Sequence, residues 1–207
     1  NRAVRAPNIQ ELFAPQFVGL DGSTDPCAGH AIQASELGCR AQALAVGQTT
    51  PLNPAEQYNG LLGGNPLLNP EKATTKTVGV VLQPSFIPRL AFTVDWWNIK
   101  LDDAVQGFGA DTILADCIAK TTDLANPAPS CALIHRNPAG SLWLSPDGFV
   151  EDVPVNVGGI KTSGFDFNGS YSHRLGGLRN LSVGFFGTWL KKKVTDKGLG
   201  DADHCAG

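Results

Sequence analysis

The chain has 207 residues, of which only 17% are charged, and its mean hydropathy is −0.06. Its 24 glycines and 14 prolines favour short elements joined by turns, which argues against a helical bundle or a coiled coil. A net charge of −3 argues against nucleic acid as a partner, and no apolar run approaches the ~18–20 residues of a membrane-spanning helix.

Four segments carry an apolar residue at every second position, which is the period of a β-strand. In chain order they are Thr74–Gln83, Leu90–Leu101, Val155–Ser172 and Asn180–Lys193. Three longer stretches are rich in Pro, Gly, Asn and Asp and are expected to be irregular: Ala6–Asn69, Asp102–Asp152 and Val194–Gly207. Inside the second of these, the apolar spacing of Gly109–Ile118 predicts a short helix that is capped by Asp111 and packs within the loop.

The connections between the strand segments differ greatly in length. Pro84–Arg89 joins the first pair and Arg174–Leu178 joins the second, and both are short enough for hairpins. The second and third segments are instead about 50 residues apart, which is typical of a functional loop. Short turns on one side and long loops on the other are typical of an outer-membrane barrel. A strand of ~10 residues tilted by ~40–45° also rises roughly 23–25 Å, the height of the apolar band of such barrels.

Aromatic residues lie near the loop ends of two of these segments, where an interface girdle would place them. Trp96 and Trp97 precede one loop and Trp189 precedes another, with Lys191–Lys193 following as if the chain returned to water and anionic headgroups. Trp96, Tyr171 and Trp189 are therefore the candidate membrane-interface residues. Alternation alone is equally typical of a soluble β-sandwich, so the pattern leaves both architectures open.

Three motifs resemble signatures of the C-terminal barrel of TonB-dependent outer-membrane receptors. They are Arg5–Phe13 (Arg-Ala-Pro-Asn-Ile-Gln-Glu-Leu-Phe), Gly64–Ala73 (Gly-Asn-Pro-Leu-Leu-Asn-Pro-Glu-Lys-Ala) and Val157–Asp166 (Val-Gly-Gly-Ile-Lys-Thr-Ser-Gly-Phe-Asp). Their order is similar to that of the family, as is the strand pair that lies between the second and the third. The resemblance covers nearly the whole chain.

The resemblance implies an all-β fold, in which residues 1–207 are part of one transmembrane β-barrel domain in the bacterial outer membrane. About four antiparallel strands, the end of a fifth and long outer loops are expected, while the plug domain and the other strands are absent. Thr75, Thr77, Asp95, Asp166 and Asn168 would face the polar lumen or the plug.

By the same resemblance, the whole protein would bind a scarce nutrient outside the cell and import it with energy from the TonB complex. A siderophore, a vitamin or a saccharide would each suit such a receptor. The expected partners are outer-membrane lipid, the protein's own plug domain, the TonB complex and an extracellular small molecule. Neither enzymatic activity nor a cofactor is expected.

The five cysteines suggest two local disulfides. Cys27 and Cys39 lie 12 residues apart in the first long loop, and Cys117 and Cys131 lie 14 residues apart in the second. Each bridge is expected to contribute roughly 3 kcal/mol by constraining its loop, in an oxidising compartment. Cys205 is expected to pair with a cysteine outside residues 1–207. A zinc site is a poor alternative, because no pair of cysteines has the spacing of zinc ligands.

Two other classes of protein remain as alternatives. The first is a secreted, disulfide-stabilised β-sandwich that binds a ligand such as a carbohydrate, and it would dissolve as a monomer in plain buffer. The second is a hydrolase with paired carboxylates, although no pattern selects such a pair. Neither a nucleophile elbow nor a phosphate-binding loop is present in the sequence.

Overall fold

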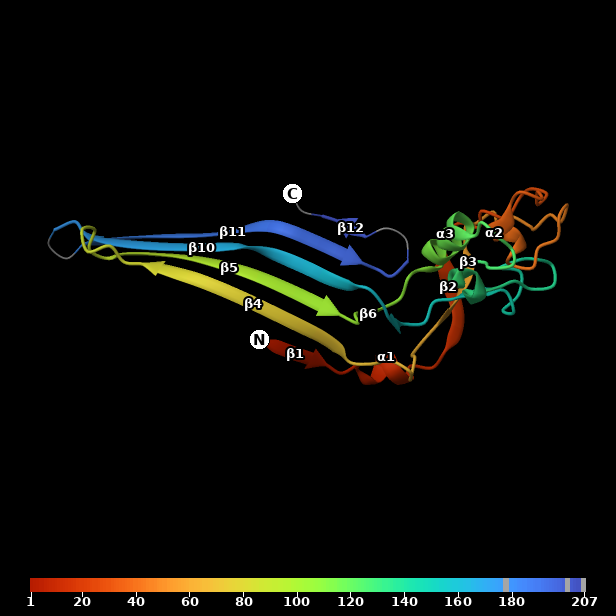
Figure 1. Ribbon diagram of the computed structural model, residues 1–207, viewed down its shortest axis with the longest axis horizontal. Coiled ribbons are helices and arrows are strands. Elements are labelled where there is room, and N and C mark those ends of the chain that lie inside the picture. Colours follow the sequence, from red (N-terminus) through yellow and green to blue (C-terminus); the bar gives the residue numbers. More distant parts are fainter. Residues whose placement is uncertain (177–178, 200–201, 206–207) are drawn as a thin grey trace.

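A six-stranded antiparallel sheet forms one part of the molecule, and a body of loops lies beyond one end of its long strands (Figure 1). The computed structural model describes residues 1–176, 179–199 and 202–205. In spatial order the strands are β1 (Arg2–Arg5), β4 (Glu71–Leu82), β5 (Leu90–Asp102), β10 (Gly159–Arg174), β11 (Asn180–Asp196) and β12 (Asp203–His204). β1 and β12 form the two edges, so the fold is all-β in its main part and the sheet is open.

The four predicted strand segments are confirmed as β4, β5, β10 and β11. The third segment is interrupted, because Gly158 has a φ of 55° and turns the chain before β10 begins. The short strand β9 (Val155–Asn156), which ends two positions before Gly158, pairs with β6 (Val105–Gln106) and not with the large sheet.

The prediction that the C-terminal stretch from Val194 is irregular is wrong for part of its length. β11 continues to Asp196, and β12 pairs His204 with Val194. Cys205 is exposed and has no disulfide partner among the described residues. Gly177 and Leu178, which belong to the predicted second hairpin turn, lie outside the described residues.

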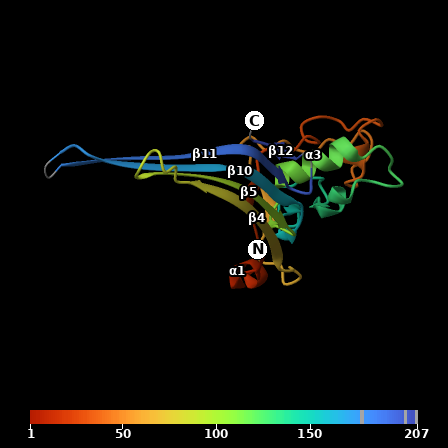
Figure 2. The ribbon, with the colours of Figure 1, turned by 60° about the vertical axis from the view of Figure 1, so that its left-hand side comes forward.

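The two long loops are folded together, contrary to the expectation that they are irregular. Residues 6–70 and 103–158, called the loop body below, form a second sheet in the order β2 (Phe17–Gly22), β3 (Tyr58–Leu62), β8 (Phe149–Glu151) and β7 (Ile134–His135). β3 and β8 pair in parallel, which joins the first loop to the second. Both views place this body at the end of the large sheet and not over its faces (Figures 1 and 2).

Helices and apolar side chains fill the loop body. The predicted helix is observed as α3 (Ala110–Lys120), and it packs against the 3₁₀ helix η1 (Pro129–Leu133) and α2 (Leu37–Arg40). Ile113 and Leu114 are fully buried, in agreement with the predicted packing role of the helix. Gly109, not Asp111, is the N-cap. Asp111 instead accepts hydrogen bonds from the backbone and the hydroxyl of Ser23, which binds the first loop to the helix.

Both predicted disulfides are present. Cys27–Cys39 lies in one small buried cluster with Ile32 and Leu44, and Cys117–Cys131 lies in the main core of the loop body. Each bridge closes its own loop, so the two loops are held to each other by non-covalent contacts.

The first two family-like motifs meet where the chain passes from the sheet into the loop body. Asn8 caps α1 (Ile9–Phe13) and shares a capping box with Glu11. Arg5 contacts both Glu11, at 3.1 Å, and Glu71, at 2.5 Å, so one guanidinium joins the helix to β4. The backbone amide of Asn65 also donates to the Glu11 carbonyl at 2.8 Å. The two motifs therefore form one structural joint.

Candidate functional site

One face of the large sheet is apolar over most of its length. Residues directly opposite each other on neighbouring strands project from the same face, so the register assigns each side chain to a side. This apolar face carries the following side chains: Val78, Val80, Leu82, Phe92, Val94, Trp96, Phe165, Phe167, Tyr171, Leu181, Val183, Phe185 and Trp189. Many are open to the surroundings, and Val78, Phe185 and Trp189 are 66%, 60% and 57% exposed.

The three candidate interface residues all lie on this apolar face. Trp96 stands opposite Phe165, which stands opposite Trp189, so an aromatic row crosses three strands. The rings of Phe165 and Trp189 stack with their centroids 5.7 Å apart. Tyr171 lies near the hairpin end, and its hydroxyl is 3.2 Å from Nδ1 of His173.

The apolar character stops abruptly at the aromatic row. In the next row toward the loops, the same face carries Lys76, Asn98, Ser163 and Lys192. A β-bulge in β11 at this level takes Lys191 out of the pairing. From Trp189 back to Leu181 the apolar band covers nine residues, which matches the ~9–11 residues of a membrane-spanning β-strand.

The opposite face holds the side chains that were predicted to face the lumen. Thr75, Thr77, Asp95 and Asp166 line a hollow of about 500 Å³, and Asn168 projects from the same side, opposite Thr93. We call this the polar face, although Val81 and Phe186 also project from it. Asp166 accepts a hydrogen bond from the Thr188 hydroxyl at 2.8 Å.

Trp97 belongs to the polar face and so does not join Trp96 in the aromatic row. Successive side chains of a strand point to opposite sides, and Trp97 therefore points away from Trp96. Its ring lies over Gly164, where an added Cβ would come within 2.7 Å of the ring and 2.5 Å of the Trp189 carbonyl oxygen. Gly164 therefore leaves room for the Trp97 ring on the polar face.

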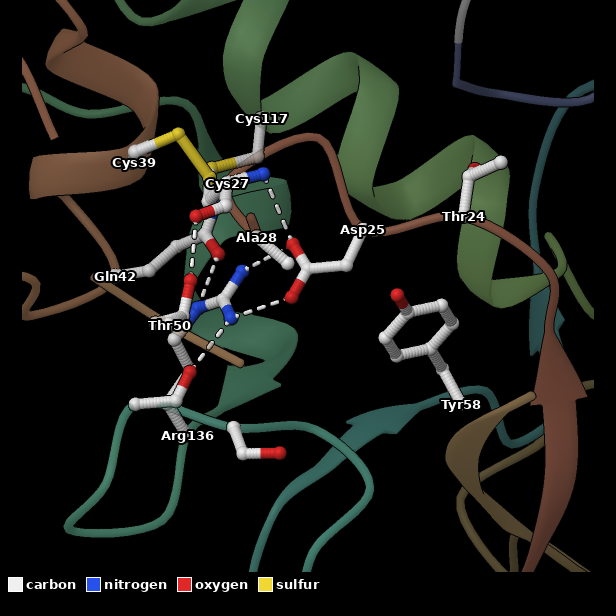
Figure 3. Close-up of polar contacts among 12 residues, drawn as sticks. Thr24, Asp25, Cys27, Ala28, Cys39, Gln42, Thr50, Tyr58, Cys117 and Arg136 are labelled. Atoms are coloured by element: carbon white, nitrogen blue, oxygen red, sulfur yellow. Dashed lines mark hydrogen bonds and ion pairs between the residues drawn. A yellow bond between two sulfur atoms is a disulfide. The ribbon is translucent and has the colours of Figure 1, made fainter. Parts of the chain in front are cut away.

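A buried ion pair joins the two loops of the loop body (Figure 3). Both terminal nitrogens of Arg136, in the second loop, donate to the Asp25 carboxylate, in the first, at 2.8 Å. Arg136 Nε donates to the Gln42 side-chain oxygen, also at 2.8 Å. The two charged side chains are only 3% and 1% exposed. Sequence analysis missed this pair, because no spacing rule connects residues that are 111 positions apart.

A pocket of about 370 Å³ opens beside this ion pair. Tyr58 forms one of its walls, and Figure 3 shows its ring facing the segment of Thr24 and Asp25. The lining contains both polar and apolar groups, and its other residues are Ser23, Pro26, Leu52, Asn53, Pro54 and Glu56. Such a lining suits a small ligand with both polar and apolar parts.

Carboxylates surround the first turn of α3 at the base of this region. Asp21 accepts from the Ala110 amide at 3.0 Å, and Asp152 accepts from the amides of Phe108 and Gly109. Burial, followed by the nearby charge of Asp152, raises the pKa of Asp21 above its usual value. The pKa of Asp111 is lowered, because hydrogen bonds from Ser23 and Thr24 outweigh the effect of its burial.

The family model described as "TonB dependent receptor-like, beta-barrel" matches residues 1–203, whereas no curated protein matches. In the described part of the chain, helices with the length and apolar character needed to cross a membrane are absent. The family match spans both the open sheet and the loop body. The chain therefore belongs to the TonB-dependent receptor family, whose members are outer-membrane transport receptors, and it forms part of the β-barrel.

Proposed function

We propose that this chain supplies wall strands and outer loops to a transporter that binds a scarce small molecule outside the cell and imports it with energy from the TonB complex. In this proposal the apolar face meets lipid, and Trp96, Tyr171 and Trp189 lie at the membrane interfaces. Thr75, Thr77, Asp95, Asp166 and Asn168 face the lumen or the plug domain. The loop body faces the outside of a bacterial cell.

The observation that carries the proposal is the difference between the two faces of one sheet. An apolar band nine residues long ends at an aromatic row and is followed at once by a polar row. In a membrane, lipid would cover such a band. In water, the band would stay exposed unless another layer of protein covered it. The β-sandwich alternative needs a second sheet over this face, and the loop sheet lies beyond its end (Figure 2).

Two hollows suit a role in capture and passage. The pocket beside Tyr58 lies in the loop body, where a ligand arriving from outside would first meet the protein. The hollow at Asp95 and Asp166 lies on the polar face, and the two carboxylates stand directly opposite each other. Like charges placed in this way are unfavourable, so a cationic group of the plug or of the passing ligand would be stabilised there.

Two adjacent valines of β4 provide a matched test. Val80 projects from the apolar face and Val81 from the polar face, and they are 55% and 63% exposed. In the full-length receptor reconstituted in phosphatidylcholine, with Cys205→Ser as background, a nitroxide is attached to Val80→Cys or to Val81→Cys. We expect the label at position 80 to collide mainly with dissolved oxygen, which concentrates in lipid. The label at position 81 should collide mainly with a water-soluble nickel complex.

Equal accessibility of the two labels, or a full-length protein that is soluble without detergent, would overturn the proposed function. Import itself is tested in cells by uptake of candidate nutrients with and without a protonophore. Uptake that continues unchanged after the proton gradient is removed would contradict the role of the TonB complex.

A further inference from the structure

We propose that the pocket beside Tyr58 binds a small organic cation, which is a molecule with an amine or guanidinium group and an apolar part, and that Glu56 is its counter-ion. This inference deepens the proposed function and rests on it, because it names the charge class of the ligand that the loop body would capture outside the cell.

The loop body is far more acidic than the rest of the chain. Residues 6–70 and 103–158 contain twelve acidic and three basic residues, which gives a net charge of −9 with the histidines neutral. The whole chain carries −3, so the remaining residues carry +6. A surface with one dominant sign of charge attracts ligands of the opposite sign and repels ligands of the same sign. The loop body therefore favours a cationic ligand over an anionic one.

The three basic side chains of the loop body all contact the protein itself. Arg40 donates to a backbone carbonyl at 3.0 Å, and Lys120 Nζ lies 2.5 Å from Asp116. Arg136, the basic residue nearest the pocket, is buried and donates to Asp25 through both of its terminal nitrogens. An anionic ligand would have to compete with these contacts for every positive charge in the loop body.

Glu56 supplies a carboxylate without a cationic partner to the pocket. It is one of two acidic residues in the lining, and it is exposed. Among the residues that the structure describes, no nitrogen of a Lys, Arg or His side chain lies within 4.0 Å of its carboxylate. The other acidic residue, Asp25, is already neutralised by Arg136. The lining therefore presents one uncompensated negative charge, which an ammonium or guanidinium group would offset.

A tight turn holds Glu56 at the edge of the pocket. The turn is built around Asn53, whose buried side chain accepts a hydrogen bond from the Ala55 amide at 2.8 Å and donates one to the Gln57 carbonyl. The Glu56 amide donates to the Asn53 carbonyl at 3.1 Å, and the φ of Glu56 is 52°, which is uncommon for a residue with a side chain. The backbone at this position is thus fixed before a ligand arrives, which lowers the entropic cost of binding.

The rest of the lining suits the apolar part of the same ligand. Leu52 lines the pocket and is 59% exposed, and two prolines and the ring of Tyr58 add further apolar surface. The volume of about 370 Å³ corresponds to about twelve water molecules at ~30 Å³ each, which is enough for a small aromatic or aliphatic amine. A ligand whose cationic group lies beside Glu56 would therefore cover apolar surface that is now exposed.

The hollow on the polar face has the same sign of charge as the pocket. Asp95 and Asp166 stand opposite each other there, and within the described ranges neither carboxylate has a cationic partner within 4.0 Å. A cation that left the pocket for the lumen would meet a second site that stabilises it, whereas an anion would be repelled at both sites.

The chain also contains a matched control for Glu56. Asp123 is an exposed acidic residue of the loop body that does not line the pocket. Asp123→Asn and Glu56→Gln remove the same charge from the same body by equally conservative changes. An effect of general charge would appear in both variants, whereas an effect of direct binding would appear only in Glu56→Gln.

The test uses the full-length receptor in phosphatidylcholine nanodiscs, with Cys205→Ser as background and Leu52→Cys as a reporter thiol in the pocket. The neutral reagent methyl methanethiosulfonate modifies this thiol in the presence of benzylamine, benzyl alcohol or benzoate, which share a carbon skeleton and are cationic, neutral and anionic. We expect only benzylamine to slow the modification. Its concentration for half-protection should rise about threefold or more in Glu56→Gln, the loss expected for one exposed ion pair, and change little in Asp123→Asn.

A second reporter controls for effects outside the pocket. Val46 is 56% exposed on the loop body and does not line the pocket, so a thiol from Val46→Cys should react at the same rate with and without benzylamine. An unchanged rate at this position in Glu56→Gln also verifies that the loop body is folded.

Equal protection by benzyl alcohol, benzoate or magnesium chloride would overturn the inference, as would the same half-protection in Glu56→Gln as in Asp123→Asn. The nitroxide labels at positions 80 and 81 separate the two proposals. If the label at position 80 reports lipid while benzylamine gives no protection, the ligand class is wrong and the proposed function stands. If that label reports water, the proposed function fails and the inference fails with it.

Discussion

The ion pair between Asp25 and Arg136 provides the sharpest test of how the two loops are held together. In Arg136→Gln the Asp25 carboxylate stays buried and keeps only the Cys27 amide as its donor among the contacts described. Removing one partner of a buried pair costs about 3–5 kcal/mol. Because 1.4 kcal/mol is a factor of ten, the loop body should open roughly 100 to 4,000 times more often.

Hydrogen exchange of the full-length receptor measures this opening. The amide of Asn59, in the first loop, donates to the Leu142 carbonyl, in the second, and so reports on the joint between them. Its exchange should accelerate by that factor in Arg136→Gln. Lys72→Gln is the control, because the Lys72–Asp103 pair is 67% and 46% exposed and exposed pairs contribute little. If both variants exchange alike, the ion pair does not hold the loops together and the reasoning is refuted.

Three further outcomes follow from the packing and the charges. Gly164→Ala should destabilise the receptor by about 1–3 kcal/mol in urea unfolding, since its Cβ would press on backbone and ring, whereas Gly184→Ala, with open space around it, should change little. The pKa of Asp111 is lowered, so its carboxylate stabilises the loop body above the unfolded pKa of ~3.9, and this stabilisation is lost as the pH falls below that value. Hydrogen exchange of the Ser23 amide should therefore become faster at low pH. The increase should be smaller in Asp111→Asn. Reducing Cys117–Cys131 should cost roughly 3 kcal/mol and expose the second loop to limited proteolysis, and unchanged cleavage would contradict this.

Much of the large sheet was predictable, because a two-residue period survives wherever one face is apolar. The segment Leu90–Leu101 differs from β5 by a single residue at its end. Thr75, Thr77, Asp95 and Asp166, which the family resemblance placed together, also lie on one side of the sheet. The loop body was not predictable in this way. Its strands are two to six residues long, too short to show a period, and Gly60 pairs with Val150 across 90 positions.

Local rules also failed where tertiary contacts compete with them. Aspartate is a favoured N-cap residue, yet the Asp111 carboxylate accepts hydrogen bonds from the backbone amides of Ser23 and Thr24 instead. The N-cap is Gly109, which has a positive φ of 82°. Counting alternate residues from Trp189 places Lys191 and Lys193 on the apolar side. The bulge in β11 shifts this count by one and places Lys192 there instead.

The three successive lysines Lys191–Lys193 make this part of β11 tolerant of a one-residue shift in register. A strand that slips by one position normally presents the wrong set of side chains to each side. Here, either alignment leaves at least one amino group pointing outward at the same height, because Lys191, Lys192 and Lys193 are interchangeable in charge and length. The repeat therefore secures a positive charge at this level whether or not the irregularity in the strand is retained.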